Sequence, residues 1–148
     1  MPSLSIQFNP KVGPITQVAI WRPAFVPPAA TPAAPMNMNM YNALIDTGAS
    51  CSCVSDKVIQ AEGLVPAGKQ QVGGLHGSQP TNSYRFQLVF PFVQTQAVTG
   101  AIAANVIAFN LLGVEFIPLP GIDVLIGRDV ICTGVFTMSF DGHATLSL

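Results

Sequence analysis

Apolar and polar residues alternate along several short stretches of the chain, the pattern that a strand with one buried face produces. Thr16–Trp21 alternates in this way, and so does Met36–Met40. The stretch Lys69–Phe90 predicts a β-hairpin whose tip is the glycine-rich segment Gly73–Gly77. Near the C-terminus, Phe136–Leu148 carries an Asp-Gly pair, which is a strong signal for a hairpin turn. These patterns predict a mostly β fold.

Two short helices, two further strands and one long loop complete this prediction. Ser55–Gly63 has a serine able to cap its first turn and a glycine able to end it, which predicts a short helix. Arg128–Cys132 is predicted as a helical turn, and we expect short strands at 114–120 and 123–127. Residues 22–36 are rich in proline and alanine, so they predict an extended loop or linker.

Composition limits the size of the fold and the kind of partner. The chain has 148 residues, and we expect 1–148 to form a single domain. Only 9% of the residues are charged, compared with about one quarter in an ordinary domain. The net charge is −1 and the six Lys and Arg residues are scattered, so we expect no binding to nucleic acid or to anionic membranes. Such a surface suggests that a partner or a second copy covers some apolar area.

One uncharged stretch raises the question of a membrane span. Gln96–Val114 contains no charged residue and approaches spanning length. Polar residues and a glycine interrupt it, so we expect two or three buried strands there rather than a transmembrane helix. Met1–Gly13 lacks a charged segment followed by an apolar one, so no signal peptide is predicted and a cytoplasmic location is expected.

The three cysteines carry little chemical information. Cys51, Cys53 and Cys132 form neither a disulfide framework nor a zinc-binding pattern. We expect small, mostly buried thiols in a reducing compartment, and we expect no metal or other cofactor.

One carboxylate occupies an unusual position. Asp46 directly follows the apolar residues Ala43–Ile45 and precedes Thr47 and Gly48. An isolated buried carboxylate is costly, so this group must be paired, hydrogen-bonded or protonated. Asp46 could open an ordinary turn, or it could accept hydrogen bonds from the backbone of the following loop. Asp-Thr-Gly alone is a weak motif, and by itself it favours these structural interpretations.

The surroundings of Asp46 change this interpretation. Three elements follow in order: the apolar-Asp-Thr-Gly-Ala-Ser stretch Leu44–Ser50, a hairpin around Val72–Tyr84, and the segment Leu125–Arg128. In this order they resemble the retropepsin-like aspartic proteases, the single-domain family that includes the retroviral proteases. The resemblance extends from about Thr16 to the end of the chain. It implies an all-β, retropepsin-like acid protease half-barrel with one or two short helices, a flap hairpin and a two-fold dimer.

The resemblance also implies roles for the residues of the Asp-Thr-Gly loop. Asp46 would be the catalytic carboxylate. Thr47 would hold the two active-site loops of a dimer together, and Gly48 would let the backbone approach the substrate. Ala49 and Ser50 would lie along the cleft and bind substrate.

Two other segments receive roles from the same resemblance. Leu125–Gly127 would form the apolar strand behind the catalytic loop, with Arg128 and Asp129 opening the last helix. The flap over the bound peptide would consist of Gly73, Gly74, Leu75, His76 and Gly77.

A single Asp-Thr-Gly stretch fits this chemistry only in a dimer. Two carboxylates share one proton: one activates water as a general base, and the other protonates or polarises the scissile carbonyl. Each chain supplies one Asp46, so a homodimer is required to build the pair. The implied activity is an aspartic endopeptidase that hydrolyses peptide or protein substrates.

The sequence departs from the family pattern beside the motif. The Asp-Thr-Gly loop of the family often carries another acid that pairs with the arginine of the Gly-Arg segment. Here Ser50–Cys53 contains no acid, so Arg128 must find another partner: Asp129, Asp56 or a carbonyl. The loop at 22–36 is also longer than is usual for the family.

Other interpretations stay open. The chain could be a catalytically silent retropepsin-like module for dimerisation or peptide binding. It could also be a monomeric half of a two-lobed, pepsin-like assembly that needs a different partner chain. We expect His76 to be an exposed loop residue, Asp123 a solvated turn residue and Asp129 a helix cap, rather than parts of a dyad within one chain.

Overall fold

The strands in the described part of the chain form two sheets, one of three strands and one of seven. The computed structural model describes residues 2–23, 38–74, 77–95, 102–117 and 119–148. None of the described helices is long and apolar enough to cross a membrane.

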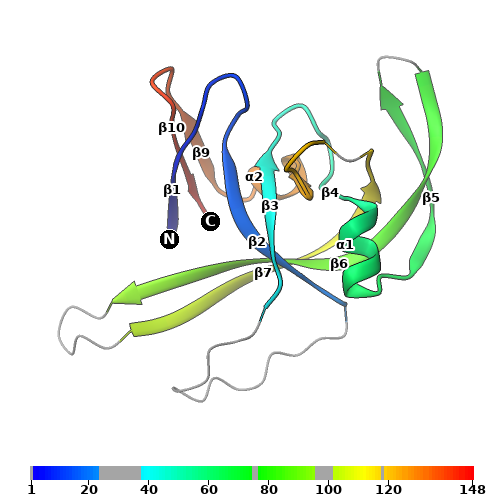
Figure 1. Cartoon of the computed structure of the whole chain (residues 1–148), viewed down its shortest axis with the longest axis horizontal. Coiled ribbons are helices and arrows are strands. Elements are labelled where there is room, and N and C mark those ends of the chain that lie inside the picture. The colour runs from blue at the N-terminus through cyan, green and yellow to red at the C-terminus, as the bar shows by residue number, and fades with distance from the viewer. Residues whose placement is uncertain (1, 24–37, 75–76, 96–101, 118) are drawn as a thin grey trace.

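The two ends of the chain meet in the smaller sheet. Its strands are β1 (Ser3–Gln7), β10 (His143–Ser147) and β9 (Val135–Met138), with β10 in the middle and both pairings antiparallel. The amide of Leu148 donates to the carbonyl of Pro2 at 3.0 Å, so the termini lie side by side (Figure 1). The C-terminal hairpin was predicted from its Asp-Gly turn, whereas β1 was not predicted.

The larger sheet closes on itself. Its order is β2-β3-β8-β4-β7-β6-β5, and β2 also pairs with β6. Six strands therefore form a barrel, and β5 continues the sheet beyond β6. The closure supports the predicted all-β architecture. The strands are β2 (Ile15–Trp21), β3 (Met40–Ile45), β4 (Cys53–Val54), β5 (Pro66–Gly74), β6 (Gly77–Thr95), β7 (Ile102–Glu115) and β8 (Val124–Ile126).

The parallel pair β3 and β8 lies in the apolar interior. Ala43 pairs with Val124 and Ile45 with Ile126, and all four side chains are buried. Continuous apolar runs such as Ala-Leu-Ile and Val-Leu-Ile are typical of strands that are covered on both faces. This pairing fixes the point at which β3 ends, and Asp46 is the next residue.

Both helices are short. Helix α1 (Asp56–Glu62) follows Ser55 and ends at Gly63, whose φ of 60° is the left-handed conformation that glycine adopts readily. The prediction of this helix is confirmed, although the hydroxyl of Ser55 makes no capping hydrogen bond. Helix α2 (Arg128–Ile131) follows Gly127, as the predicted helical turn requires.

Three predictions of strand extent differ from the structure. β3 begins at Met40, so Met38 and Asn39 precede the strand, and residues 36–37 lie outside the described residues. The predicted strand at 114–120 ends at Glu115. Two or three buried strands were expected within 96–114; residues 96–101 lie outside the described residues, and 102–114 belong to one long strand, β7, because β6 pairs with it from Ile102 to Val114. Of the loop at 22–36, only Arg22 and Pro23 are described.

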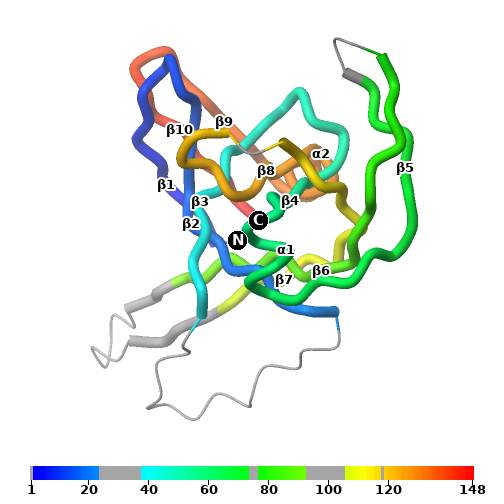
Figure 2. The backbone as a smooth tube through the Cα atoms, turned by 45° about the vertical axis from the view of Figure 1, so that its right-hand side comes forward, coloured from blue at the N-terminus to red at the C-terminus, as the bar shows by residue number. Residues whose placement is uncertain are grey.

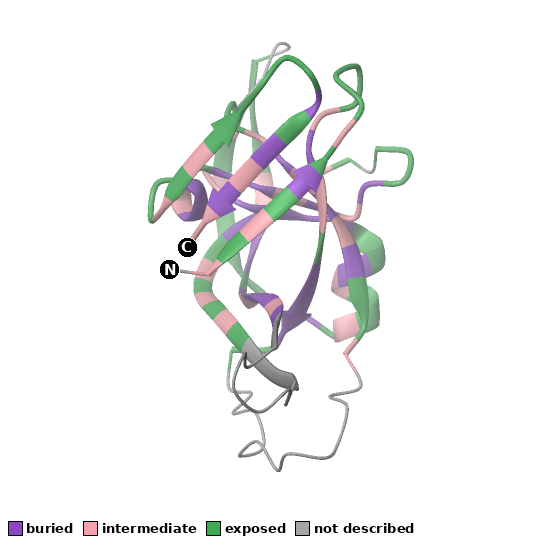
Figure 3. Cartoon of the chain, turned by 90° about the vertical axis from the view of Figure 1, so that its left-hand side faces the viewer, coloured by how far each residue is buried: buried purple, intermediate pink, exposed green. Residues whose placement is uncertain are grey.

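The arrangement of the elements places the loop after β3 between two projecting parts. In Figures 1 and 2 the terminal sheet lies on one side and the β5–β6 hairpin projects on the other. The loop that joins β3 to β4 lies between them in both views. Figure 3 looks onto the terminal sheet, where buried positions alternate with more exposed ones along β10.

Candidate active site

Asp46 is fixed by the backbone of its own loop. Its amide donates to the carbonyl of Ile126 at 2.9 Å, which continues the pairing of β3 with β8 by one residue. The amide of Gly48 donates to Asp46 Oδ1 at 2.9 Å, and the amide of Ala49 donates to the carbonyl of Asp46 at 3.2 Å. A Cβ on Gly48 would lie 3.1 Å from Asp46 Oδ1, so glycine leaves room for this close approach. The carboxylate therefore has a defined orientation within a single chain.

The returning end of the same loop is bound to the start of α2. The amide of Ser52 donates to Asp129 Oδ2 at 2.9 Å, and its hydroxyl donates to Asp129 Oδ1 at 2.8 Å. The hydroxyl also accepts from the amide of Gly127 at 3.1 Å. Asp129 was expected to cap the helix, and this prediction is wrong because its carboxylate reaches back to the loop instead.

Arg128 contributes to the loop through its backbone. Its amide donates to the carbonyl of Ala49 at 3.0 Å. Its side chain is exposed and has neither a hydrogen-bond nor an ion-pair partner among the described residues, so none of the three expected partners is found. Asp123, expected to be solvated, instead forms an ion pair with Lys57 at 2.8 Å and accepts from the amide of Asn42 at 3.2 Å.

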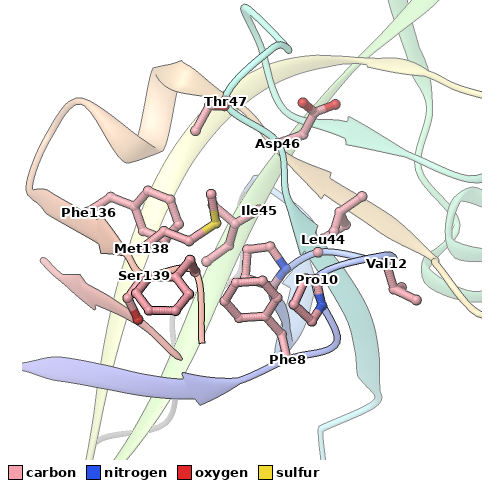
Figure 4. Close-up of a pocket in the computed structure, with 13 residues that line it drawn as sticks. Phe8, Pro10, Val12, Leu44, Ile45, Asp46, Thr47, Phe136, Met138 and Ser139 are labelled. Carbon is pink, nitrogen blue, oxygen red and sulfur yellow. The ribbon is translucent and has the colours of Figure 1, made fainter. Parts of the chain in front are cut away.

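A cleft of about 380 Å³ adjoins Asp46. It is lined by residues between Phe8 and Pro14, by Leu44–Thr47, and by residues between Phe136 and Phe140. Figure 4 shows the apolar side chains gathered together, with the Asp46 carboxylate at the edge and pointing away from them. Asp46 is the one carboxylate among the described residues that line this cleft.

Large apolar side chains are exposed around this cleft. Val12, Met138 and Phe140 line it, with exposed fractions of 54%, 59% and 97%, and Val135, which lies on β9 together with Met138, is 58% exposed. Large exposed apolar patches are typical of surfaces that bind another molecule.

The structure places the predicted site residues in two groups. Asp46 and Thr47 share the cleft, whereas Gly48, Ala49 and Ser50 lie on the same loop without lining it. Of the residues predicted to form a flap, Gly73 and Gly74 lie at the end of β5 and Gly77 at the start of β6, where Gly73 pairs with Ser78 and Gly74 with Gly77. None of the described hairpin residues lines the cleft, and Leu75 and His76 lie outside the described residues.

The walls of the cleft and the Ser52–Asp129 network were not predicted. A signal for the first wall exists in the alternation of Leu4, Ile6 and Phe8 with polar residues, which predicts a strand leading to the cleft. The network has no local signal, because its two members lie 77 residues apart.

Neither Cys53 nor a cluster of metal-ligating side chains offers a second site among the described residues. Burial raises the pKa of the Cys53 thiol to about 12, so this thiol stays protonated and unreactive at neutral pH. Within the described part of the chain, no group of three His, Cys, Asp or Glu side chains could hold a metal ion.

Comparison with known proteins identifies the fold. No family model and no curated protein matches the sequence. Among solved structures, a retropepsin-like aspartic protease from Rickettsia conorii is similar, with a TM-score of 0.56 and 14% sequence identity. The match covers 98% of this chain and 90% of the other. The chain has the retropepsin-like fold. At this identity the likeness establishes the architecture, and the role of Asp46 must be argued from its own surroundings.

Proposed function

We propose that the protein is an aspartic endopeptidase that works as a homodimer. The observation that carries this proposal is the setting of Asp46: its orientation is fixed by the Gly48 amide, and no second carboxylate lines the adjoining cleft among the described residues. One oriented carboxylate per chain is half of the pair that this chemistry needs.

The proposed reaction uses the Asp46 carboxylates of two protomers. Two ionised carboxylates about 3 Å apart repel each other, so the pair holds one shared proton at acid pH. The ionised member takes a proton from a water molecule, which attacks the scissile carbonyl carbon. The protonated member donates to the carbonyl oxygen, and proton transfer to the leaving nitrogen then allows the peptide bond to break. We expect the greatest activity at acid pH, because ionisation of both carboxylates removes the shared proton.

Exposed apolar side chains support the homodimer. Met138 and Phe140 are exposed beside Asp46, and a two-fold contact through this region would bury them and bring the two Asp46 loops together. The scarcity of charged residues, 9% of the chain, also suits a surface that a second copy covers.

We propose extended peptides as substrates and the β5–β6 hairpin as the flap. The hairpin projects on one side of the Asp46 loop (Figure 1), and an extended peptide between them could pair with backbone groups on both sides. Leu44 is half-buried and could contact an apolar substrate side chain, whereas Ile126 is fully buried and is therefore excluded from that role.

The test is cleavage of a peptide library by the wild-type protein and by the Asp46→Asn variant. We expect the variant to lose detectable cleavage and to sediment as the same dimer as the wild type. An inhibitor that mimics the tetrahedral intermediate should bind the wild type. Unchanged cleavage by the variant would refute the catalytic role of Asp46. A dimeric wild type that cleaves nothing and does not bind the inhibitor would instead be a dimerisation or peptide-binding module.

A further inference from the structure

We propose that Ser52 and Asp129 are positioning residues that hold the Asp46 loop in its active geometry. The inference rests on the proposed function, since it assigns the residues through which this chain orients its catalytic carboxylate. Both residues act through the loop backbone, and neither lines the cleft.

The contact between Ser52 and Asp129 uses the hydrogen-bonding groups of both residues. Asp129 accepts from the amide and from the hydroxyl of Ser52, one bond on each carboxylate oxygen, at 2.9 and 2.8 Å. The same hydroxyl accepts from the amide of Gly127 at 3.1 Å. Ser52 is fully buried, so its polar groups depend on these partners. Loss of one member would leave the other unsatisfied, which is the costly case for a buried polar group.

This arrangement reverses the charge pattern implied by the family resemblance. That pattern places an acid on the loop and an arginine at the start of the helix. Here the loop supplies hydrogen-bond donors and the helix supplies the acid, Asp129. The Arg128 side chain, left without an acid on the loop, is exposed and has no partner among the described residues. The network therefore provides the attachment that an acid–arginine pair would otherwise make.

The effect of the network reaches Asp46 through a short stretch of backbone. Ala49 accepts from the Arg128 amide at 3.0 Å and donates its own amide to the carbonyl of Asp46 at 3.2 Å. Release of Ser52 from Asp129 frees the returning end of this loop. A shift of about 1 Å in a catalytic group can reduce the rate by about a hundredfold. The expected loss is in kcat, because neither residue contacts the substrate.

The test compares Asp129→Asn with Asp123→Asn as a matched control. Asp123 also accepts a backbone amide and pairs with a side chain, but it lies just before β8 and its partners, Asn42 and Lys57, are outside the Asp46 loop. We expect Asp129→Asn to lower kcat by about tenfold to a hundredfold with KM changed less than about twofold. Asp123→Asn should keep the wild-type kcat. Ser52→Ala, which removes the hydroxyl alone, should also lower kcat, but by less than Asp129→Asn does.

A second measurement does not depend on activity. Amide hydrogen exchange at Ala49 and Arg128 should accelerate by about tenfold or more in Asp129→Asn and stay unchanged in Asp123→Asn. If both variants exchange at these amides like the wild type, or if both lower kcat equally, the positioning role is refuted. If the wild type has no activity but the exchange difference is found, the proposed function fails and the positioning of the loop stands.

Discussion

Gly127 is the glycine at the start of α2 where the structure predicts a strong response to one added methyl group. A Cβ at Gly127 would lie 2.4 Å from the carbonyl carbon of Cys51, 2.6 Å from its oxygen and 2.9 Å from the amide nitrogen of Ser52. All three contacts are with backbone of the Asp46 loop, which cannot rotate away as a side chain can. The φ of Gly127 is −90°, which any residue adopts, so the whole cost of Gly127→Ala is steric.

The size of this cost follows from the number of backbone contacts. Overpacking of a close-packed site usually costs about 1–3 kcal/mol, and the absence of any movable side chain places Gly127→Ala at about 3 kcal/mol or more. For a domain of this size such a loss lowers Tm by about 6–12 °C. The assay is thermal unfolding at a fixed protein concentration, because dimerisation would make Tm concentration-dependent.

Gly73→Ala is the matched control. A Cβ there would meet nothing within 4 Å, and the backbone has no positive φ, so we expect a change below about 0.5 kcal/mol. A Gly127→Ala protein whose Tm lies within about 2 °C of the wild type would refute the close packing of the loop against the start of α2.

Two further predictions concern the dimer and the alkaline limit of stability. Phe140→Ser should raise the dimer dissociation constant by about tenfold to a hundredfold in sedimentation. The Phe140 side chain is 97% exposed in one chain, and the variant removes the apolar area that the dimer would bury there. An unchanged dissociation constant would exclude this side chain from the interface. Burial is the largest cause that raises the pKa of Tyr41 above its ordinary value of 10, and the hydrogen bond to Glu62 is the next. Above pH 10 the folded chain therefore keeps a proton that the unfolded chain releases. The free energy of unfolding should therefore fall as the pH rises above 10. Urea unfolding of Tyr41→Phe should show a weaker dependence on pH in this range. The same dependence in both proteins would contradict the role assigned to Tyr41.

Elements with a local signal were predictable from the sequence. Helix α1 ends at Gly63 because a glycine can take the left-handed conformation there, and that signal is visible in the sequence. The C-terminal hairpin follows in the same way from its Asp-Gly turn. The resemblance carried by three ordered segments gave the fold, which the similar solved structure bears out.

Features that depend on distant pairing were not predictable in this way. β7 is a single strand because β6 pairs with it from Ile102 to Val114, although its apolar bursts suggested several strands. β1 pairs with β10 at the far end of the chain, so nothing close to it in the sequence marks its partner. For the same reason the sequence leaves open whether Asp129 caps a helix or meets Ser52, since only the folded barrel brings β8, α2 and the Asp46 loop together.

Subunit mixing tests most directly whether two chains share one catalytic pair. Wild-type protein is equilibrated with a roughly ninefold molar excess of Asp46→Asn, and peptide cleavage is measured per wild-type chain. If each site needs Asp46 from both protomers, random pairing leaves about one tenth of the wild-type chains with a wild-type partner, and activity should fall to about one tenth. Activity per wild-type chain that is unchanged by the excess variant would contradict the shared carboxylate pair.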